Sequence, residues 1–270
     1  MELDFHKPHR KVKKRKLWSH KHNEEPFSLH RHGLQELSVL LISSAKDRGN
    51  GLSSCQAMEL SRFRTKAKYD LRDHVTGYSR EDVLKAYFYL FDELFFFGSI
   101  GPHCALHLKV VEARTDKATL NGKTQSLGKG RNILTIYLRK LEDRTRLEAM
   151  LGYVGTLLHE MIHVFMYCWA CDHGRCADAI REDGAGHGPV WQDVAYALEL
   201  AVRDRGFLGL KISLARADSL ALEIHRTGKW PARNKLAGWE ICEEDLKSQL
   251  QSIQNYGGVA TVRRVVNGGR

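Results

Sequence analysis

Two histidines and a glutamate within five residues are the feature of this chain most suggestive of chemistry. His159, Glu160 and His163 form the sequence HEMIH. Four residues of an α-helix turn through about 400°, so the two histidines share one face, roughly 6 Å apart along the axis. Imidazoles at this spacing can bind one Zn²⁺, and the intervening acid can reach a water in an open coordination position. The pattern predicts the core of a zinc hydrolase with Glu160 as general base.

The residues around this motif predict a long amphipathic or buried helix. Between residues 146 and 167 there is no proline, and apolar residues recur at steps of three and four. Two histidines and an acid on such an apolar helix are costly to bury without partners. We therefore favour a metal site over a core helix that carries two satisfied histidines and a surface acid.

A third metal ligand is expected downstream, because a catalytic zinc takes three protein ligands and leaves one position to water. Glu182, Glu199 and His173 are candidates, although Glu182 lies in the turn-like sequence REDG. His187, in GAGHGPVW, is the best candidate. The glycines around it allow a tight turn close to a metal, and the proline suits the first turn of a following helix. An ordinary glycine loop remains the alternative.

A group of cysteines after the HEMIH helix is a candidate for a second, structural zinc site. The sequence CWACDHGRC contains Cys168, Cys171, His173 and Cys176. A C-x₂-C pair chelates zinc well, and a further thiolate with an imidazole would complete the site, although so short a segment would make a strained cage. Two other interpretations stay open. The thiols are reduced in an ordinary loop, or one of them regulates the catalytic zinc by displacing its water.

HEMIH followed by GHGPVW resembles the SprT-like metalloproteases, the family of the Spartan-type DNA–protein crosslink proteases. The resemblance is specific over residues 147–200 and weaker upstream, at YLFDELFFFGSI. It implies a zincin-like fold in which His159, His163 and His187 bind zinc and Glu160 is the general base. It also implies that the substrates are proteins bound or crosslinked to DNA. The chain departs from the family in an apparent insertion, CWACDHGRCADAIRED, and in the absence of the Cys-pair zinc ribbon of some relatives.

The composition argues against a membrane or secreted protein. Hydrophobic residues make up 43% of the chain, no apolar run approaches the roughly 20 residues that span a bilayer, and the basic N-terminus has no signal-peptide core. We expect an intracellular protein whose six cysteines are reduced or metal-bound. Neither membrane association nor a small-molecule cofactor is expected.

The net charge of +10 is concentrated in two basic segments. The first contains KVKKRK, residues 11–16, which is typical of a nuclear-localisation signal or a nucleic-acid-binding patch, although a solvated tail is the alternative. The second, HRTGKWPARNK with Trp230 and Trp239 nearby, mixes cations with aromatic rings as single-strand binders do. It is equally compatible with a tail that folds onto the domain. The expected partners are protein substrates and DNA, and the expected location is the nucleus, with the cytoplasm as a second site.

The order of elements predicts an α+β fold. We expect a largely disordered basic tail over 1–60, in which residues 34–47 could form a short helix, a zincin-like protease domain over 79–225 and a basic extension over 226–270. Ser79 has the spacing of a helix cap, with the helix running to about Phe96. CALHLKVVEA and NILTIYL are expected as strands, joined by a glycine-containing connection, in a small antiparallel sheet packed on the HEMIH helix.

Two hypotheses of function follow. In the first, a zinc endopeptidase, an extended substrate pairs with the edge of NILTIYL, and Glu160 moves the proton of the attacking water. In the second, the chain is a non-catalytic, basic nucleic-acid-binding module, and a structural zinc ties two helices together. The second requires a closed site with a fourth protein ligand, and it gives no reason for an acid at Glu160.

Overall fold

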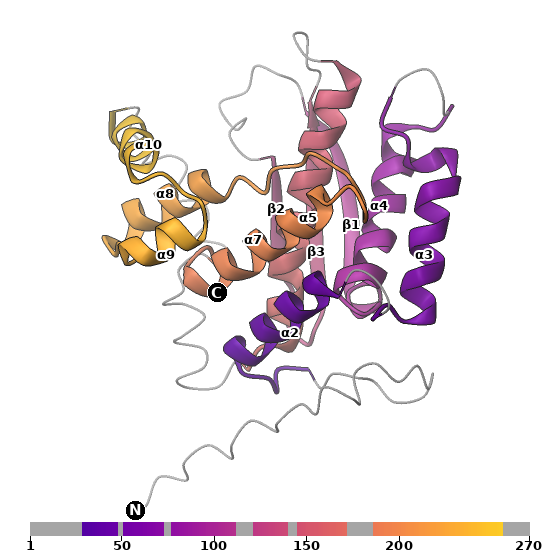
Figure 1. Cartoon of the computed structure of the whole chain (residues 1–270), viewed down its shortest axis with the longest axis horizontal. Helices are drawn as coiled ribbons and strands as arrows, with labels where there is room; N and C mark the ends of the chain where they lie inside the picture. The colour runs from indigo at the N-terminus through magenta and orange to yellow at the C-terminus, as the bar shows by residue number, and fades with distance from the viewer. Residues whose placement is uncertain are drawn as a thin grey trace, which may run out of the picture.

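The part of the chain that the structure describes contains one three-stranded sheet and eight α-helices (Figure 1). The structure is a computed structural model, and it describes residues 29–47, 51–72, 77–111, 121–139, 145–171 and 186–255. The elements are α2 (Leu34–Lys46), α3 (Ser54–Thr65), α4 (Arg80–Phe95), β1 (Cys104–Val111), β2 (Gly122–Ser126), β3 (Asn132–Arg139), α5 (Arg146–Trp169), α7 (Pro189–Arg203), α8 (Arg216–Thr227), α9 (Arg233–Gly238) and α10 (Glu243–Asn255).

The sheet is mixed, with the strand order β1-β3-β2, so the expectation of an antiparallel sheet is wrong for one of its two pairings. β1 runs parallel to β3, with Cys104 opposite Asn132, whereas β2 runs antiparallel, with Ser126 opposite the same Asn132. The segment expected as a plain connection contains β2. Glycines with positive φ at 128 and 130 close a tight hairpin between β2 and β3. This hairpin occupies one edge of β3, and β1 pairs with the other.

α5 is the central helix and carries the HEMIH motif, as predicted from its apolar periodicity. Thr145 and Glu148 form a capping box at its start, with the Thr145 N–H donating to the Glu148 carboxylate at 2.8 Å. The helix packs against β2, β3, α4 and α7. By length and composition α5 could cross a membrane, but 78% of its most apolar window is buried within the protein. It is therefore placed as a core helix.

The helices α2 and α3 belong to the main core, so the expected tail over 1–60 is too long. The short helix expected at 34–47 is confirmed, and Leu37 and Leu41 from it are almost fully buried in the cluster that surrounds α5. Gln56 of α3 donates to the Leu94 carbonyl at the end of α4, at 2.9 Å. This bond satisfies a carbonyl that the helix leaves free. The basic run 11–16 lies outside the described residues.

The C-terminal region forms a second, smaller hydrophobic cluster rather than only a basic extension. α8, α9 and α10 pack around Trp239 and Leu246, and Figure 1 shows them beyond α7, away from the sheet. The Trp239 indole N–H donates to Asp193 of α7 at 2.7 Å, which attaches the cluster to the main body. The expected boundary at 225 therefore falls inside α8, and the two clusters divide near residue 215 instead.

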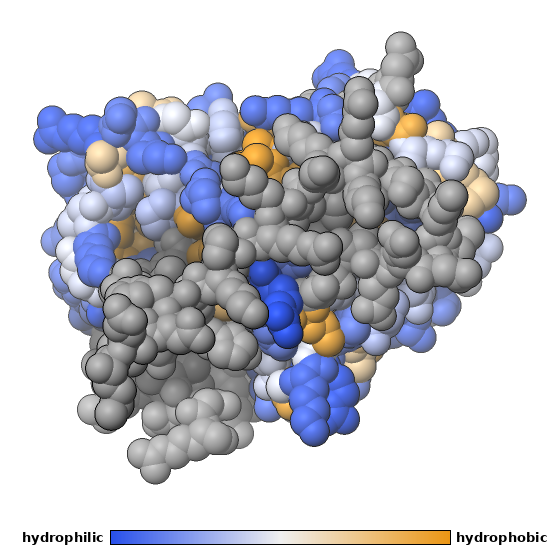
Figure 2. Space-filling model, turned by 90° about the horizontal axis from the view of Figure 1, so that it is seen from below, coloured by the Kyte–Doolittle hydropathy of each residue, from blue (hydrophilic) through white to orange (hydrophobic). Residues whose placement is uncertain are grey.

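The described surface is mainly hydrophilic on the face that Figure 2 shows, where apolar residues form small separate patches. The large exposed hydrophobic residues are scattered over many elements and include Val39, Met58, Tyr89, Val110 and Trp230. Scattered apolar residues are normal on soluble proteins. We therefore expect the described residues to recognise a partner through charge and backbone hydrogen bonds rather than through a large hydrophobic patch.

Candidate metal centre

Three histidines from two elements converge on one point. His159 and His163 project from α5, and His187 lies in the turn just before α7. Their Nε2 atoms are 2.9 Å (His159 to His187), 3.1 Å (His163 to His187) and 3.2 Å (His159 to His163) apart. The three residues form a group that could hold a metal ion, and among the described residues no further Asp, Glu, Cys or His belongs to it.

The electrostatics of this triad favour a cation at its centre. Burial lowers the pKa of His159 to about 4, and burial together with the neighbouring imidazoles holds the pKa of His163 and of His187 well below the ordinary value. All three rings are therefore neutral at pH 7. Neutral imidazole nitrogens that face one another at about 3 Å present converging lone pairs, and these repel unless a proton or metal lies between them.

A backbone carbonyl fixes the orientation of His159. The His159 Nδ1–H donates to the Leu214 carbonyl at 2.9 Å, which leaves the Nε2 lone pair free for a metal. The loop that carries Leu214 crosses α5 at Gly155, where a Cβ would lie only 2.3 Å from the Ser213 carbonyl oxygen. Glycine at 155 is thus required for the close approach that brings Leu214 to His159.

The turn before α7 places His187. Gly186 has a φ of +88°, and a Cβ there would lie 2.9 Å from His163 Nδ1. Only glycine therefore fits both the left-handed backbone and the space against the His163 ring. Pro189 opens α7 directly after the turn, as the sequence predicted.

Trp191, which the sequence analysis did not single out, packs against all three imidazoles. Its ring centroid lies 4.6 Å from that of His159 and 4.8 Å from that of His187. It stacks on His163 at 5.8 Å with an interplanar angle of 15°. The indole is buried and shields the triad from water on one side. Only its position four residues after His187 hints at this role.

Glu160 is buried beside the triad, where β2 lies on α5. The Thr124 hydroxyl of β2 donates to Glu160 Oε2 at 2.8 Å. A Cβ at Gly122 would be 2.7 Å from the Thr156 methyl group and 3.1 Å from Glu160 Cγ, so glycine allows this contact. Burial raises the pKa of Glu160 to about 7, and the hydrogen bond from Thr124 partly opposes that shift.

Tyr167 is a residue of this site that the sequence analysis did not single out. Its ring stacks on that of His163 at 6.4 Å, one helical turn further along α5. Burial, followed by the charge of Glu160, raises the pKa of the Tyr167 hydroxyl. The spacing of four from His163 and seven from Glu160 is the signal that could have found it.

The other candidate third ligands do not join the triad where they are described. The Glu199 carboxylate accepts the Leu214 N–H and pairs with Arg216 instead. Glu182 and His173 lie outside the described residues.

The cysteine group is described only in part. Cys168 is buried, the Asn132 side-chain N–H donates to its Sγ at 3.1 Å, and burial raises the pKa of its thiol to about 12. Cys171 is buried as well. His173 and Cys176 lie outside the described residues, so a second metal site here stays a prediction.

The prediction that a substrate pairs with a free edge of the NILTIYL strand is wrong. β3, the NILTIYL strand, is central and hydrogen-bonded on both sides. Among the described residues no strand pairs with the outer edge of β2, the strand that contacts Glu160 through Thr124.

Comparisons with protein-family models, with curated proteins and with solved structures found no significant match. The site is therefore interpreted from its own geometry.

Proposed function

We propose that this chain is a zinc-dependent endopeptidase in which His159, His163 and His187 bind the metal and Glu160 is the general base. The observation that carries the proposal is the convergence of three neutral Nε2 atoms within 2.9–3.2 Å. Nitrogen ligands of a tetrahedral zinc lie about 3.3 Å apart, because each Zn–N bond measures about 2.0–2.1 Å. The triad needs only a small expansion to match that spacing, and imidazole is a preferred zinc ligand.

The number of ligands among the described residues, three, supports a catalytic site over a structural one. Three imidazoles are the protein ligands of many catalytic zinc sites, whereas structural sites are closed by a fourth. Zinc bound there would lower the pKa of a coordinated water and polarise a substrate carbonyl. Glu160 would accept a proton from the attacking water and return it to the leaving amine. Its burial and its bond to Thr124 hold the carboxylate in place for both transfers.

The outer edge of β2 is the proposed binding site for an extended peptide. Strand addition supplies backbone hydrogen bonds without demanding a particular sequence, as a protease with varied targets requires. Thr124 lies on this strand and also bonds to Glu160, so a peptide paired with β2 runs past the general base. Tyr167, which stacks on His163, is the proposed donor to the oxygen that develops charge during attack.

The proposed substrates are proteins bound or crosslinked to DNA. This part rests on the SprT-like resemblance and on the charge of +10, which favours contact with phosphates. Among the described residues Trp230 is 45% exposed and lies beside Lys229 in the second basic segment. An exposed indole among cations suits stacking on an unpaired base. We further propose that the basic run 11–16 directs the chain to the nucleus.

The test is DNA-stimulated cleavage of a DNA-bound protein by the zinc-loaded full chain. Chelation should abolish cleavage and added zinc should restore it. Glu160→Gln should lower kcat by about 10²–10⁴-fold while zinc stoichiometry is unchanged, since a general base contributes on that scale. Glu148→Gln is the matched control, because it changes another acid of α5 and glutamine still supports the capping box.

Full activity in Glu160→Gln would reject the mechanism. Stoichiometric zinc in a wild-type chain that binds DNA but cleaves no bound protein would favour the non-catalytic module instead. Cleavage of small peptides with no response to DNA would retain the peptidase and remove the proposed substrate class.

A further inference from the structure

We infer that two buried side chains of α7, Glu199 and Gln192, are positioning residues that set the geometry of the metal centre. The inference rests on the proposed zinc site and extends it beyond the three ligands. Neither residue belongs to the triad, and each is connected to one of its members through a single backbone group.

Glu199 acts on His159 through Leu214. Its Oε1 accepts the Leu214 N–H at 2.6 Å, and the carbonyl of the same residue accepts the His159 Nδ1–H at 2.9 Å. The carboxylate is almost fully buried. Glu199 thus holds Leu214 through the Leu214 N–H, and the Leu214 carbonyl in turn orients the His159 ring. Groups that hydrogen-bond to a metal-binding histidine commonly fix the orientation and the tautomer of its ring in this way.

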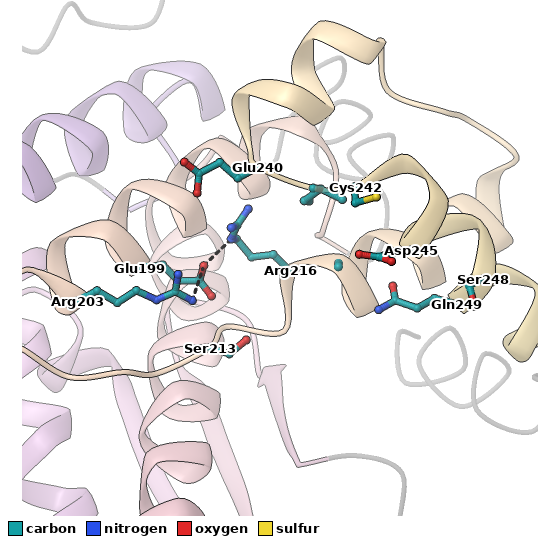
Figure 3. Close-up of a pocket in the computed structure, with 11 residues that line it drawn as sticks. Glu199, Arg203, Ser213, Arg216, Glu240, Cys242, Asp245, Ser248 and Gln249 are labelled. Atoms are coloured by element: carbon teal, nitrogen blue, oxygen red, sulfur yellow. Dashed lines mark hydrogen bonds and ion pairs between the residues drawn. The ribbon is translucent and has the colours of Figure 1, made fainter.

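An ion pair keeps the Glu199 carboxylate in place. Arg216 Nε donates to Glu199 Oε2 at 2.7 Å, and only 10% of the Arg216 side chain is exposed. Figure 3 shows the Glu199 side chain between those of Arg203 and Arg216. These three residues line a cavity of about 450 Å³. Arg216 also donates to the Trp239 carbonyl, so the C-terminal cluster supports the same pair. A buried charge with two fixed partners is a rigid anchor.

The loop that Glu199 holds is in a conformation that needs an anchor. Ala215 has a φ of +52°, in the left-handed region that costs a non-glycine residue about 1–2 kcal/mol. The preceding Ser213 carbonyl lies against α5 at Gly155. Without the bond from Glu199 to Leu214, the loop can relax away from this strained backbone and withdraw the carbonyl from His159.

Gln192 forms the second connection, to His187. Its side-chain N–H₂ donates to the His187 carbonyl at 3.3 Å and to the Arg216 carbonyl at 3.1 Å. The residue has no exposed surface. One amide thereby connects the turn that carries His187 to the loop that orients His159. Through these two side chains, α7 fixes the separation of the ligands that come from different elements.

The experiment measures metal binding rather than proteolysis. Zinc affinity is determined by competition with a chromophoric chelator, and the absorption spectrum of the Co²⁺-substituted protein reports the ligand geometry. Glu199→Leu and Gln192→Leu should each weaken zinc binding by about 10-fold, the lower end of the range for such outer partners. Both should also change the Co²⁺ spectrum at saturating metal. Glu199→Gln should retain affinity within about 3-fold, because its amide oxygen can still accept the Leu214 N–H.

Asp92→Leu is the matched control. Asp92 is another buried acid that holds a loop, through the N–H groups of Ile100 and Gly101, but it has no connection to the triad. Its loss should lower the melting temperature and leave zinc affinity and the Co²⁺ spectrum unchanged. If Glu199→Leu does not fold, Gln192→Leu decides the question against the same control.

Wild-type affinity and an unchanged Co²⁺ spectrum in Glu199→Leu or in Gln192→Leu would overturn the inference. An equal loss of affinity in Asp92→Leu would also overturn it, by showing that any loss of stability has this effect. A wild-type chain that binds zinc but cleaves nothing would reject the endopeptidase and leave the inference intact. A wild-type chain that binds no zinc would reject both.

Discussion

The histidine triad and the cysteines that follow it are both good sets of zinc ligands, but the structure treats them differently. In the triad, three Nε2 atoms point at one another, and the Leu214 carbonyl accepts from the Nδ1 atom on the opposite side of the His159 ring. At the end of the same helix, the Cys168 thiol already has a partner, the amide of Asn132, and its pKa is raised to about 12. The triad has lone pairs that converge on one point, whereas the Cys168 thiol accepts from Asn132 and donates to the Gly130 carbonyl.

This difference shows what separates a candidate metal centre from a buried side chain that could also bind zinc but serves only the core. Spacing in the sequence brings ligands to one face, but a metal also requires lone pairs directed at a common point. His163 and Cys168 are five residues apart on α5, and both are buried. Among the described residues, only His163 meets a candidate ligand from another element. Five predictions can break or sharpen this comparison.

The largest contrast is expected between His187→Ala and Cys168→Ala in zinc affinity. Removing one imidazole should weaken binding by about 10²–10³-fold, since a zinc site worth about 10–16 kcal/mol is shared among its ligands. Cys168→Ala should leave the affinity of the triad unchanged. Chelator competition with both variants decides this. Loss of a second equivalent of zinc in Cys168→Ala would show that the cysteine group binds metal too.

Cys168→Ala should instead reduce the free energy of unfolding by about 2 kcal/mol, because it opens a small cavity and leaves the Asn132 amide unpaired. Denaturant melts of the zinc-loaded protein measure this change. Cys242→Ala is the control, since that thiol is exposed and should have little effect. Equal stability of the two variants would mean that the contact with Asn132 contributes nothing.

Gly186→Ala should weaken zinc binding by about 10-fold. The left-handed backbone costs alanine about 1–2 kcal/mol, and the new Cβ would push on the His163 ring. Gly228→Ala provides the control, because Gly228 also has a positive φ but its Cβ would meet open space. It should lose stability without losing zinc affinity. A similar affinity loss in both variants would argue against a specific effect on His163.

The pH dependence of the metal-free protein tests the burial of the triad. Burial holds the triad pKa values below those of the unfolded chain, so the unfolded state binds protons first as the pH falls. This part of the stability is present above about pH 6.5 and declines toward pH 4, by up to about 1.4 kcal/mol per pH unit for each histidine. The slope of melting temperature against pH should be shallower in His159→Ala. An unchanged slope would contradict the assigned shift.

The Cys168 thiol should affect stability at alkaline pH, whereas the triad affects it at acidic pH. The pKa of Cys168 is raised, so its contribution is present below about pH 8.5 and declines as the pH rises. A loss of stability at alkaline pH that disappears in Cys168→Ala is expected from the same melting curves.

The local sequence predicted the helices and strands whose own apolar periodicity or capping residues mark them. α5 follows from apolar residues at helical steps, and α4 begins at its Ser79 cap as expected. β1 and β3 were recognised from their β-branched residues. By contrast, β2 has the polar sequence GKTQS, and it is a strand because β3 supplies its hydrogen bonds. The cluster of α8, α9 and α10 was also missed, because its core depends on contacts between short helices.

The sequence by itself determined that His159 and His163 share a helix face with Glu160 between them, because that placement follows from the 3.6-residue helical repeat. The tertiary structure alone decided that His187 meets them, that β2 rather than β3 lies beside Glu160, and that Leu214 orients His159. These three outcomes join residues distant along the chain, and packing of whole elements governs them. A glycine makes each approach possible, at 186, 122 and 155, where any side chain would collide with the opposite element.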